Sequence, residues 1–550
     1  MARNSHRLLA PFVAGLAAGA VAVAVSLILK ETSGGLFLPE IASQALFSIT
    51  PGEFESQAVE NFGPLAKYSA FIGSIIANIV AFGIIAIFLD KLFARLKRRG
   101  YLLEALLSSA LSYIIFIIIA IILVTLIQSR SGIQVVSLPL IVLSLIPSQL
   151  AFGFVLSSFF YGRAKIKSPE VLDRSPDKSI DTMHVKYSRG AFLRLVAASA
   201  IALPIIFLGV DRLLSRQNEA QELASTSSNL LPQTGPTPKG FEDPNLAPLL
   251  ASEVTPTYLF YRIDINPIVP QVDSNSWNLA IKGLVEKPLT INYDQIKSMP
   301  SIEEYVTLEC ISNKIGGDLI STALWKGVRL SHLLEKAVIK PNVKYVVFRC
   351  ADGYDVGIPI EKSQMEGTIL AYAMNSAPLT PKHGFPVRAI VPGLYGMMNP
   401  KWITEIELVD KVYEGYWQRL GWSNSAEDNT GSFILIPGQA PARQRFRGLD
   451  ETEDTSYGGK VPIAGIAFAG NRGISKIEVS TDGGTTWKTA QIKDPLSQYT
   501  WVLWTAGYVP PNKENYRIVV RATDKTGKIQ TTEMTPPFPN GATGYHTITA

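Results

Sequence analysis

The sequence predicts a multidomain protein in which an all-α membrane part precedes an α+β domain and a C-terminal immunoglobulin-like β-sandwich. Three observations support this fold class: uncharged apolar runs before residue 211, short strand-like runs mixed with a helical pattern from 251 to about 410, and alternating strands around tight turns from 457 to 550. The chain of 550 residues is also too long for one core, because single cores stop growing near about 250–300 residues.

The first 211 residues contain apolar stretches that are long enough to cross a lipid bilayer. A transmembrane helix needs about 20 apolar residues, and a single such run can also be a buried helix of a soluble core. Four uncharged runs so close together favour the membrane, and a fifth, shorter run is interrupted by Pro204. We therefore expect five membrane helices in residues 1–211, at 8–29, 68–89, 105–129, 131–162 and 195–210.

The Lys and Arg residues of the connecting loops predict the orientation of these helices. If the N-terminus is inside, fifteen of them lie in the inner segments and three, Lys30, Lys67 and Arg130, in the outer loops. Because loops rich in Lys and Arg stay in the cytoplasm, we expect a multi-pass protein of the cytoplasmic membrane whose polar C-terminal part faces outward. The net charge of +5 largely reflects this bias, so we expect the lipid bilayer, and no nucleic acid, as a partner.

Composition divides the remaining chain into three parts. Residues 212–250 are rich in Ser, Gln, Pro, Asn and Gly and are expected to form a flexible stalk. Residues 251–456 combine strand-like runs such as YVTLEC and KYVVFRC with the helical pattern LSHLLEKAV, and become loop-like after about 411. In residues 457–550, ISKIEVSTDGGTTWKTAQI alternates on both sides of Asp-Gly-Gly, a strong hairpin signal, so this part is expected to be a sandwich.

Cys310, one of only two cysteines, ends the run YVTLEC just before a loop of small residues and Lys314. It can be a small buried side chain, half of a disulfide, a nucleophile or a metal ligand. A nearby lysine favours the thiolate that metals and electrophiles require, and small residues let a backbone approach a ligand. A disulfide with Cys350 is disfavoured, because each cysteine ends its own strand-like run. The residues alone leave the other three roles open.

Three motifs, in this order, resemble the sulfite oxidase family of molybdopterin enzymes. They are VTLECISNKIGGDLISTALWKGVRLSHLLEKA, HGFPVRAIVPGLYGMMNPKWITEIEL and GIAFAGNRGISKIEVSTDGGTTWKTA, and the resemblance covers residues 255–550. It implies a sulfite-oxidase-type molybdopterin-binding domain in 251–456 and, in 457–550, the immunoglobulin-like domain usually called the molybdenum-cofactor dimerisation domain. It also implies a molybdenum–molybdopterin cofactor.

The resemblance assigns roles to individual residues. Cys310 is expected to give its thiolate, a soft donor, to molybdenum, whereas Cys350 has no matched role. Arg262 lies in FYRIDINPIVPQVD, which corresponds to the strand that opens the family's domain but lacks its neighbouring Asn-His pair. Without the motifs, surface ion pairs or caps would explain the charged residues. The cofactor is expected to be held by Arg262, Asn313, His383, Arg388, Gly396 and Lys401.

Departures from the family's pattern concern the substrate. Lys314 stands where the family has an arginine that binds sulfite, and Trp422 stands where an active-site tyrosine is expected, while Trp325 matches a pocket tryptophan. A lysine is a point charge without the bidentate fork of arginine. The resemblance therefore implies catalytic roles for Cys310, Lys314, Trp325 and Trp422 and leaves the substrate open.

The implied activity is two-electron oxygen-atom transfer on a small substrate outside the membrane. Electrons are expected to pass to or from a separate electron-transfer protein or quinone-linked subunit. No haem is predicted in this chain, because none of its five histidines lies in an apolar run and no C-x-x-C-H motif is present. The dimerisation-type domain suggests a homodimer.

Three further readings accompany this expectation. A reductase of sulfoxides or N-oxides would use the same cofactor, and a non-enzymatic surface module would use the sandwich for adhesion. The stretch SRGAFLRLVAASAIALP resembles a twin-arginine export signal with Gly190 in the position of the second arginine. A plain basic flank of the fifth helix explains this stretch equally well.

Overall fold

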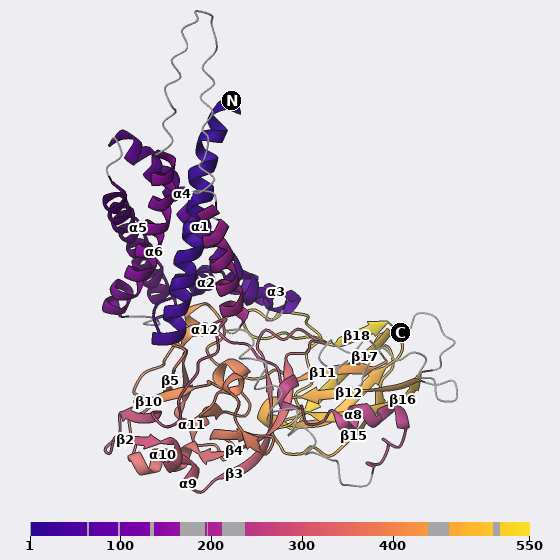
Figure 1. The fold of residues 1–550 in the computed structure, drawn as a ribbon. Coiled ribbons are helices and arrows are strands. Elements are labelled where there is room, and N and C mark those ends of the chain that lie inside the picture. Colours follow the sequence, from indigo (N-terminus) through magenta and orange to yellow (C-terminus); the bar gives the residue numbers. More distant parts are fainter. Residues whose placement is uncertain are drawn as a thin grey trace, which may run out of the picture. The chain divides into compact units, whose positions relative to one another are not determined.

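The computed structural model describes residues 2–62, 65–96, 100–132, 137–164, 193–194, 196–211, 237–437, 461–509 and 517–549. The chain divides into two compact units. The first contains the apolar helices. The second contains the sheets that follow residue 217, together with two short segments from between the helices, Thr50–Ala66 and Arg130–Ile133. Figure 1 shows the elements in chain order.

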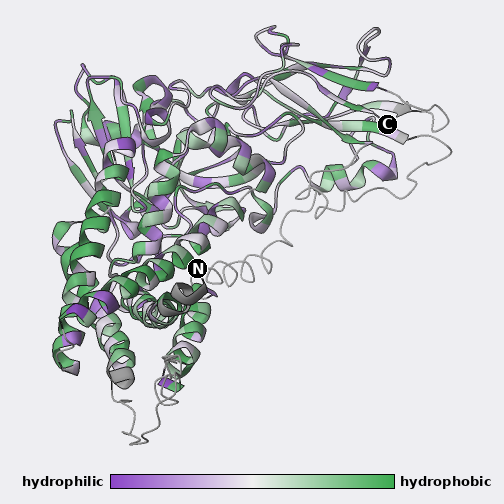
Figure 2. Cartoon of the chain, turned by 90° about the horizontal axis from the view of Figure 1, so that it is seen from above, coloured by the Kyte–Doolittle hydropathy of each residue, from purple (hydrophilic) through white to green (hydrophobic). Residues whose placement is uncertain are grey.

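The first unit contains four helices of 23 to 31 residues that are long and apolar enough to cross a membrane. In Figure 2, most residues of these helices have the green of high hydropathy. A shorter apolar helix, Val196–Asp211, follows. The helix predicted at 131–162 begins only at Leu138, because Ser131 still belongs to the preceding helix and Gly132, with a φ of 71°, follows the end of that helix. The long helices are α1 (Ala2–Ser33, with its span starting at Leu8), α4 (Leu65–Arg95), α5 (Tyr101–Ser131) and α6 (Leu138–Ala164).

Small residues bring these helices close together. A Cβ added to Gly15 of α1 would lie 2.8 Å from the Cα of Gly83 in α4, and one added to Gly153 of α6 would lie 2.7 Å from the backbone nitrogen of Ser109 in α5. Close approach at small residues is a common way for membrane helices to pack. The ring of Phe82 fills the space between neighbouring helices, with centroids 4.3 Å from Phe116 and 4.5 Å from Phe152.

Two helices that the sequence analysis did not predict lie in the loop between α1 and α4. Helix α2 (Leu38–Ile49) belongs to the first unit, whereas α3 (Gly52–Phe62) belongs to the second. Leu38, Ile41 and Ala45 of α2 are buried at helical spacing. This amphipathic pattern is short, and the sequence analysis missed it because much longer apolar runs lie on both sides.

One five-stranded sheet of the α+β domain has the order β2-β1-β10-β5-β6. Strands β1 and β10 are parallel, with Ala280 opposite Glu405, and the other neighbours are antiparallel. Helix α10 (Leu330–Ala337) buries Leu330, Leu333 and Leu334 in the same core as this sheet. The strands are β1 (Asn278–Gly283), β2 (Leu289–Asn292), β5 (Tyr345–Cys350), β6 (Asp355–Pro359) and β10 (Ile403–Val409), and short helices are α9 (Tyr293–Ser298), α11 (Ile360–Ser363) and α12 (Tyr416–Arg419).

The second sheet of this domain positions Cys310. Its order is β3-β4-β7-β8, and β9 pairs with β7. Val306, Leu308 and Cys310 lie in one buried cluster with Phe260 and Trp325. Alternate residues of a strand share a face, so Cys310 continues the buried face of β3 directly beyond its last residue, Glu309. The strands are β3 (Ile302–Glu309), β4 (Ile320–Arg329), β7 (Ile369–Met374), β8 (Ala377–Pro378) and β9 (Arg388–Ile390).

The C-terminal part is a β-sandwich, which confirms the prediction. Its sheets have the orders β11-β12-β16-β15 and β14-β13-β17-β18, and Ile434, Ile477 and Trp504 contribute to the core between them. The predicted hairpin is formed by β13 and β14, with Gly483 and Gly484 at positive φ between them. The strands are β11 (Gly431–Ile436), β12 (Val461–Phe468), β13 (Ile474–Ser480), β14 (Lys488–Thr489), β15 (Gln491–Ile492), β16 (Val502–Val509), β17 (Arg517–Asp524) and β18 (His546–Thr549).

The structure moves two of the predicted boundaries. Strand β11 precedes residue 457 but pairs with β12, with Phe433 opposite Ile466, so the sandwich begins near residue 431. The end of the predicted stalk is packed, because Phe241, Leu246 and Leu249 are buried in a cluster with Phe433. Of the stalk predicted at 212–250, residues 212–236 lie outside the described residues. Residues 188–192 and 195 of the segment that resembles an export signal also lie outside them.

Hydrogen bonds join the sandwich to strand β3. The backbone N–H of Thr307 donates to the carbonyl of Tyr499 at 3.0 Å, and the N–H of Trp501 donates to the hydroxyl of Thr307 at 2.9 Å. The hydroxyl of Ser497 donates to the carbonyl of Tyr305 at 2.6 Å. The strand that leads to Cys310 is therefore fixed by both domains.

Candidate molybdenum-cofactor site

Cys310 lies in a loop that returns on itself. Its backbone N–H donates to the carbonyl of Leu319 at 2.9 Å, and its carbonyl accepts from the N–H of Asn313 at 2.9 Å. The side chain of Asn313 closes the loop, because it accepts from the N–H of Leu319 at 3.0 Å and donates to Glu309 at 2.8 Å. Burial raises the pKa of Glu309 to about 7, and the Asn313 hydrogen bond opposes this shift.

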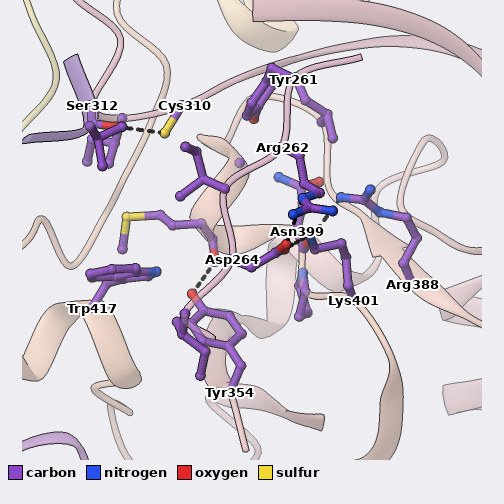
Figure 3. A pocket seen from close by; sticks show the side chains of 18 of the residues that line it. Tyr261, Arg262, Asp264, Cys310, Ser312, Tyr354, Arg388, Asn399, Lys401 and Trp417 are labelled. Carbon is purple, nitrogen blue, oxygen red and sulfur yellow. Dashed lines mark hydrogen bonds and ion pairs between the residues drawn. The ribbon is translucent and has the colours of Figure 1, made fainter. Parts of the chain in front are cut away.

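The thiol of Cys310 lines a pocket of about 900 Å³, open solvent included. In Figure 3, Cys310, Ser312 and Trp417 lie on one side of this pocket, which we call the thiol side. Arg262, Arg388 and Lys401 lie on the other, which we call the basic side. The Sγ of Cys310 is 3.0 Å from the Oγ of Ser312.

An irregular segment carries several lining residues into the pocket. Residues 260–265 all line it, and they form no strand, although a strand was expected in this stretch. Pro267 and Pro270 follow closely, and proline removes the N–H that a sheet requires. The irregular backbone instead directs Tyr261, Arg262 and Asp264 toward the cavity (Figure 3).

Positive charge exceeds negative charge on the basic side. Asp264 pairs with Arg262 at 3.0 Å and also with Lys401. Burial lowers the pKa of Lys401, an effect that Asp264 opposes. Burial, and then Arg262, lower the pKa of the neighbouring Lys382 to about 8. Burial also raises the pKa of Asp352, which lines the same pocket, to about 7, so this carboxyl group supplies only part of a negative charge near neutral pH.

Arg388 is the most deeply buried cation of the basic side. Its side chain donates to the carbonyls of His383 at 3.3 Å and Asn399 at 3.1 Å. Burial lowers its pKa to about 10, so it is still charged at neutral pH. Its Nε is buried and has no hydrogen-bond partner among the described residues. A buried charge with an unused donor is costly unless a ligand completes its surroundings.

His383 is a neutral member of the site. Its Nε2–H donates to the carbonyl of Thr257 at 2.8 Å. Burial, followed by the charges of Arg388 and Lys401, lowers its pKa to about 3. A neutral imidazole leaves Nδ1 as an acceptor. His383 therefore adds a hydrogen-bonding group to the pocket without adding charge.

These residues fit a molybdopterin cofactor that carries a phosphate. The basic side has excess positive charge and an unused Arg388 donor for an anion. Gly384 has a φ of 104° and a Cβ there would lie 3.0 Å from the Cβ atoms of Arg388 and Lys401, so the backbone can pass close to both cations. On the thiol side, Cys310 would supply one thiolate to the metal.

The structure brings most of the predicted residues to this pocket. Lys314 is exposed and is not among the lining residues, whereas Asn313 and Trp325 are buried behind the lining. The ring of Trp325 packs against the guanidinium group of Arg388, and the side chain of Asn313 closes the Cys310 loop through its hydrogen bond with Leu319. The predicted residues that line the pocket are Cys310, Arg262, His383, Arg388, Gly396, Lys401 and Trp422.

Several lining residues were missed by the sequence analysis. Tyr261 and Asp264 flank the predicted Arg262, and Asn399 lies two residues before Lys401, so the same motifs contained their signal. Asp352 and Tyr354 follow Cys350 in the turn after β5. Glu55, Ser56 and Val59 of helix α3 also line the pocket, and no motif near residue 55 indicates this.

Two family models match the chain. Residues 266–417 match the oxidoreductase molybdopterin binding domain, and residues 448–538 match the Mo-co oxidoreductase dimerisation domain. The first range covers the two sheets and the pocket residues from Leu308 to Trp417. The second covers most of the sandwich strands but begins after β11.

Curated relatives match the same part of the chain. Mitochondrial sulfite oxidase of Rattus norvegicus is 29% identical over 326 residues, which cover 52% of this chain and 59% of that protein. The human enzyme is also 29% identical and is covered to 59%. The chain therefore spans about three fifths of the length of these relatives. The uncharacterized oxidoreductase YuiH of Bacillus subtilis is 33% identical over 150 residues, covering 27% of this chain and 74% of that protein.

A solved structure is also similar. The sulfane dehydrogenase SoxCD of Paracoccus pantotrophus has a chain that is 24% identical, with a TM-score of 0.46. The match covers 54% of this chain and 80% of that chain.

Proposed function

Because this chain belongs to the sulfite oxidase family of molybdopterin oxidoreductases, we propose that it is an enzyme that transfers an oxygen atom to or from a small substrate. The observation that carries this proposal is the pairing of Cys310 with the basic side in one pocket. One side offers a soft thiolate for the metal, and the other offers cations for the phosphate of the cofactor.

When bound, the molybdenum–molybdopterin group supplies the two-electron redox chemistry and the oxygen-atom exchange. The protein holds and orients the reactants. Arg262, Arg388 and Lys401 would hold the anionic end of the cofactor, and His383 would add a neutral hydrogen-bonding group. The loop closed by Asn313 fixes the thiol of Cys310. Trp417 and Trp422, whose ring centroids are 6.4 Å apart, add apolar surface to the pocket wall.

The reaction balances only with an electron partner. In the oxidising direction, substrate and water give the oxygenated product, two protons and two electrons, and in the reducing direction the same species run backward. We assign the two electrons to a separate electron-transfer protein or a quinone-linked subunit. The prediction that this chain itself carries no haem belongs to the same proposal.

The proposed location is the outer face of the cytoplasmic membrane. Four long apolar helices are compatible with a membrane protein. The basic-residue bias puts the loops at residues 34–64 and 132–137 outside. The segments Thr50–Ala66 and Arg130–Ile133, which group with the C-terminal unit, overlap these two loops. This grouping supports an outward-facing enzyme. The dimerisation-type domain supports a homodimer.

A second candidate is a reductase of sulfoxides or N-oxides on the same cofactor. Lys314, which stands in the position of the sulfite-binding arginine, is exposed and does not line the pocket. A sulfite site would benefit from a cation that contacts the oxyanion. This observation favours a substrate other than sulfite.

Metal and pterin analysis of the purified full-length protein tests the proposal. We expect about one molybdenum and one pterin per chain, and oxygen-atom transfer with an artificial electron acceptor or donor. A protein that is folded but contains neither molybdenum nor pterin would overturn the proposal. That result would favour the non-enzymatic surface module instead.

A further inference from the structure

Helix α3 comes from the loop between the first two long apolar helices, yet it forms part of the pocket wall. It belongs to the same compact unit as the α+β domain. Glu55, Ser56 and Val59 line the pocket, and their spacing puts them on one face of a helix. Glu53 and Gln57 are exposed. One face of α3 is therefore turned toward the candidate site.

Packing fixes α3 at two points. Val59 is 6% exposed and lies in the same buried cluster as Cys310 and Tyr261. A Cβ added to Gly52 would lie 2.9 Å from Cδ2 of Phe538, so only glycine fits there. The ring of Phe538 packs edge-on against Trp422, with centroids 5.2 Å apart. The helix thus packs against the residues around Cys310 through Val59, and against Phe538, the neighbour of Trp422, through Gly52.

Two buried donors of this pocket have no partner among the described residues. The side chain of Ser56 is 3% exposed, and its Oγ makes no hydrogen bond there. Trp422 is 5% exposed, and its Nε1 likewise makes none. Buried polar groups are normally satisfied. A ligand with an oxygen acceptor would satisfy both.

A buried carboxyl group of helix α3, that of Glu55, also lines the pocket. Glu55 is 5% exposed. Burial, followed by the Glu55 carboxylate, raises the pKa of Tyr416, whose ring lies 4.8 Å from that of Trp417 on the thiol side. The basic residues among the described lining are Arg262, His383, Arg388 and Lys401. Three of these lie on the basic side in Figure 3, and the carbonyl of His383 accepts from Arg388.

We infer that α3 is the substrate-facing wall of the pocket, where Ser56 and Trp422 donate to a substrate oxygen and Glu55 disfavours oxyanions. The site then prefers an uncharged oxo compound over an anion of similar size. This inference rests on the proposed function. It adds Glu55 and Ser56, which lie about 200 residues before the segment that resembles the family.

The test measures the binding of two unreactive tetrahedral probes, sulfate and dimethyl sulfone, to the full-length, cofactor-loaded protein by calorimetry. The probes are similar in size and differ in charge. We expect dimethyl sulfone to bind about tenfold more tightly than sulfate. In Glu55→Gln, this preference should be lost, because the carboxylate that repels the anion is gone. Ser56→Ala should weaken both probes about fivefold, because each has an oxygen acceptor. Glu53→Gln, on the exposed face of the same helix, should match the wild type.

Two results would overturn the inference. One is sulfate binding as tight as dimethyl sulfone binding in the wild type. The other is that Glu55→Gln and Ser56→Ala both behave as Glu53→Gln does, which would make α3 a structural contact only. Pterin content is measured on every sample. If the wild-type protein contains no pterin, both the proposed function and this inference are wrong. If the protein contains pterin but Glu55→Gln and Ser56→Ala bind both probes as Glu53→Gln does, only the inference is wrong.

Discussion

The guanidinium carbon of Arg388 lies 4.9 Å from the ring centroid of Trp325. Trp325 is fully buried, and its Nε1 donates to the carbonyl of Val306 at 3.3 Å, which fixes the ring. An aromatic face attracts a cation, and arginine also stacks on it through its planar group. Trp325 is thus placed to position Arg388 and, through it, the basic side of the pocket.

Arg388→Lys is expected to lower the pterin content of the purified protein about tenfold. Lysine keeps the charge but loses the planar stacking on Trp325 and the geometry that reaches two carbonyls. Pterin released by denaturation is measured by fluorescence per mole of protein. Arg349→Lys is the matched control, because Arg349 pairs with Glu407 at 2.8 Å on the other sheet and does not line the pocket. Equal pterin in both variants would contradict the assigned role of Arg388.

Acid is expected to destabilise the protein through two buried histidines. Burial lowers the pKa of His383 to about 3 and that of His546 to about 4, below the ordinary value of 6.5. The unfolded chain therefore binds more protons than the folded chain between these values and 6.5. Stability is fully present above pH 6.5 and is lost as the pH falls toward the folded-state values.

His383→Gln should remove part of this acid sensitivity, because the glutamine amide can still donate to Thr257 but does not titrate. The expected gain at pH 4, relative to the change at pH 7, is about 3 kcal/mol or less. It is measured as the shift of the thermal unfolding midpoint between the two pH values. His332→Gln on α10 is the control. Equal pH dependence of both variants and the wild type would show that His383 takes up its proton in the folded state near pH 6.5.

The motifs predicted the pocket well where its residues lie close together along the chain. Cys310 follows a strand whose alternation is visible in YVTLEC, and His383 and Arg388 share the motif HGFPVR. Tertiary packing decides that Trp325 contacts Arg388 and that Lys314 is exposed. Spacing along the chain does not specify such packing.

The boundaries and helix α3 were harder to predict for physical reasons. Strand β11 is buried at all six positions, so it lacks the polar alternation that identifies a half-exposed strand. Phe241 and Leu249 are isolated apolar residues in a polar stretch, and only their cluster with Phe433 reveals that they are packed. Glu55 is separated from Cys310 by several apolar helices, and only folding brings α3 to the pocket.

Thiol labelling in intact cells tests the proposed orientation. Ser225→Cys, in the predicted stalk, should react with a membrane-impermeant maleimide before lysis, because the basic-residue bias places the stalk outside. Ser175→Cys, in the loop that follows α6, is the matched control and should react only after lysis. The native cysteines are both buried, which limits background labelling. The reverse pattern would put the enzyme on the cytoplasmic side.

Cys310→Ser is expected to abolish oxygen-atom transfer and to change the electronic spectrum of the metal. A hydroxyl cannot replace the electron density that a thiolate gives to molybdenum. The basic side is untouched by this substitution, so pterin content should stay close to that of the wild type. Activity, the absorption spectrum and pterin content are measured on the same sample.

Cys350→Ser is the internal control, because Cys350 is equally buried, has a free thiol and does not line the pocket. Burial raises the pKa of its thiol, as expected of a packed, unreactive side chain. Its replacement should cost about 1 kcal/mol of stability and leave the metal spectrum unchanged. If Cys310→Ser also kept full turnover and an unchanged spectrum, Cys310 would be a core residue like Cys350, and the thiolate could not be the protein's ligand to the metal.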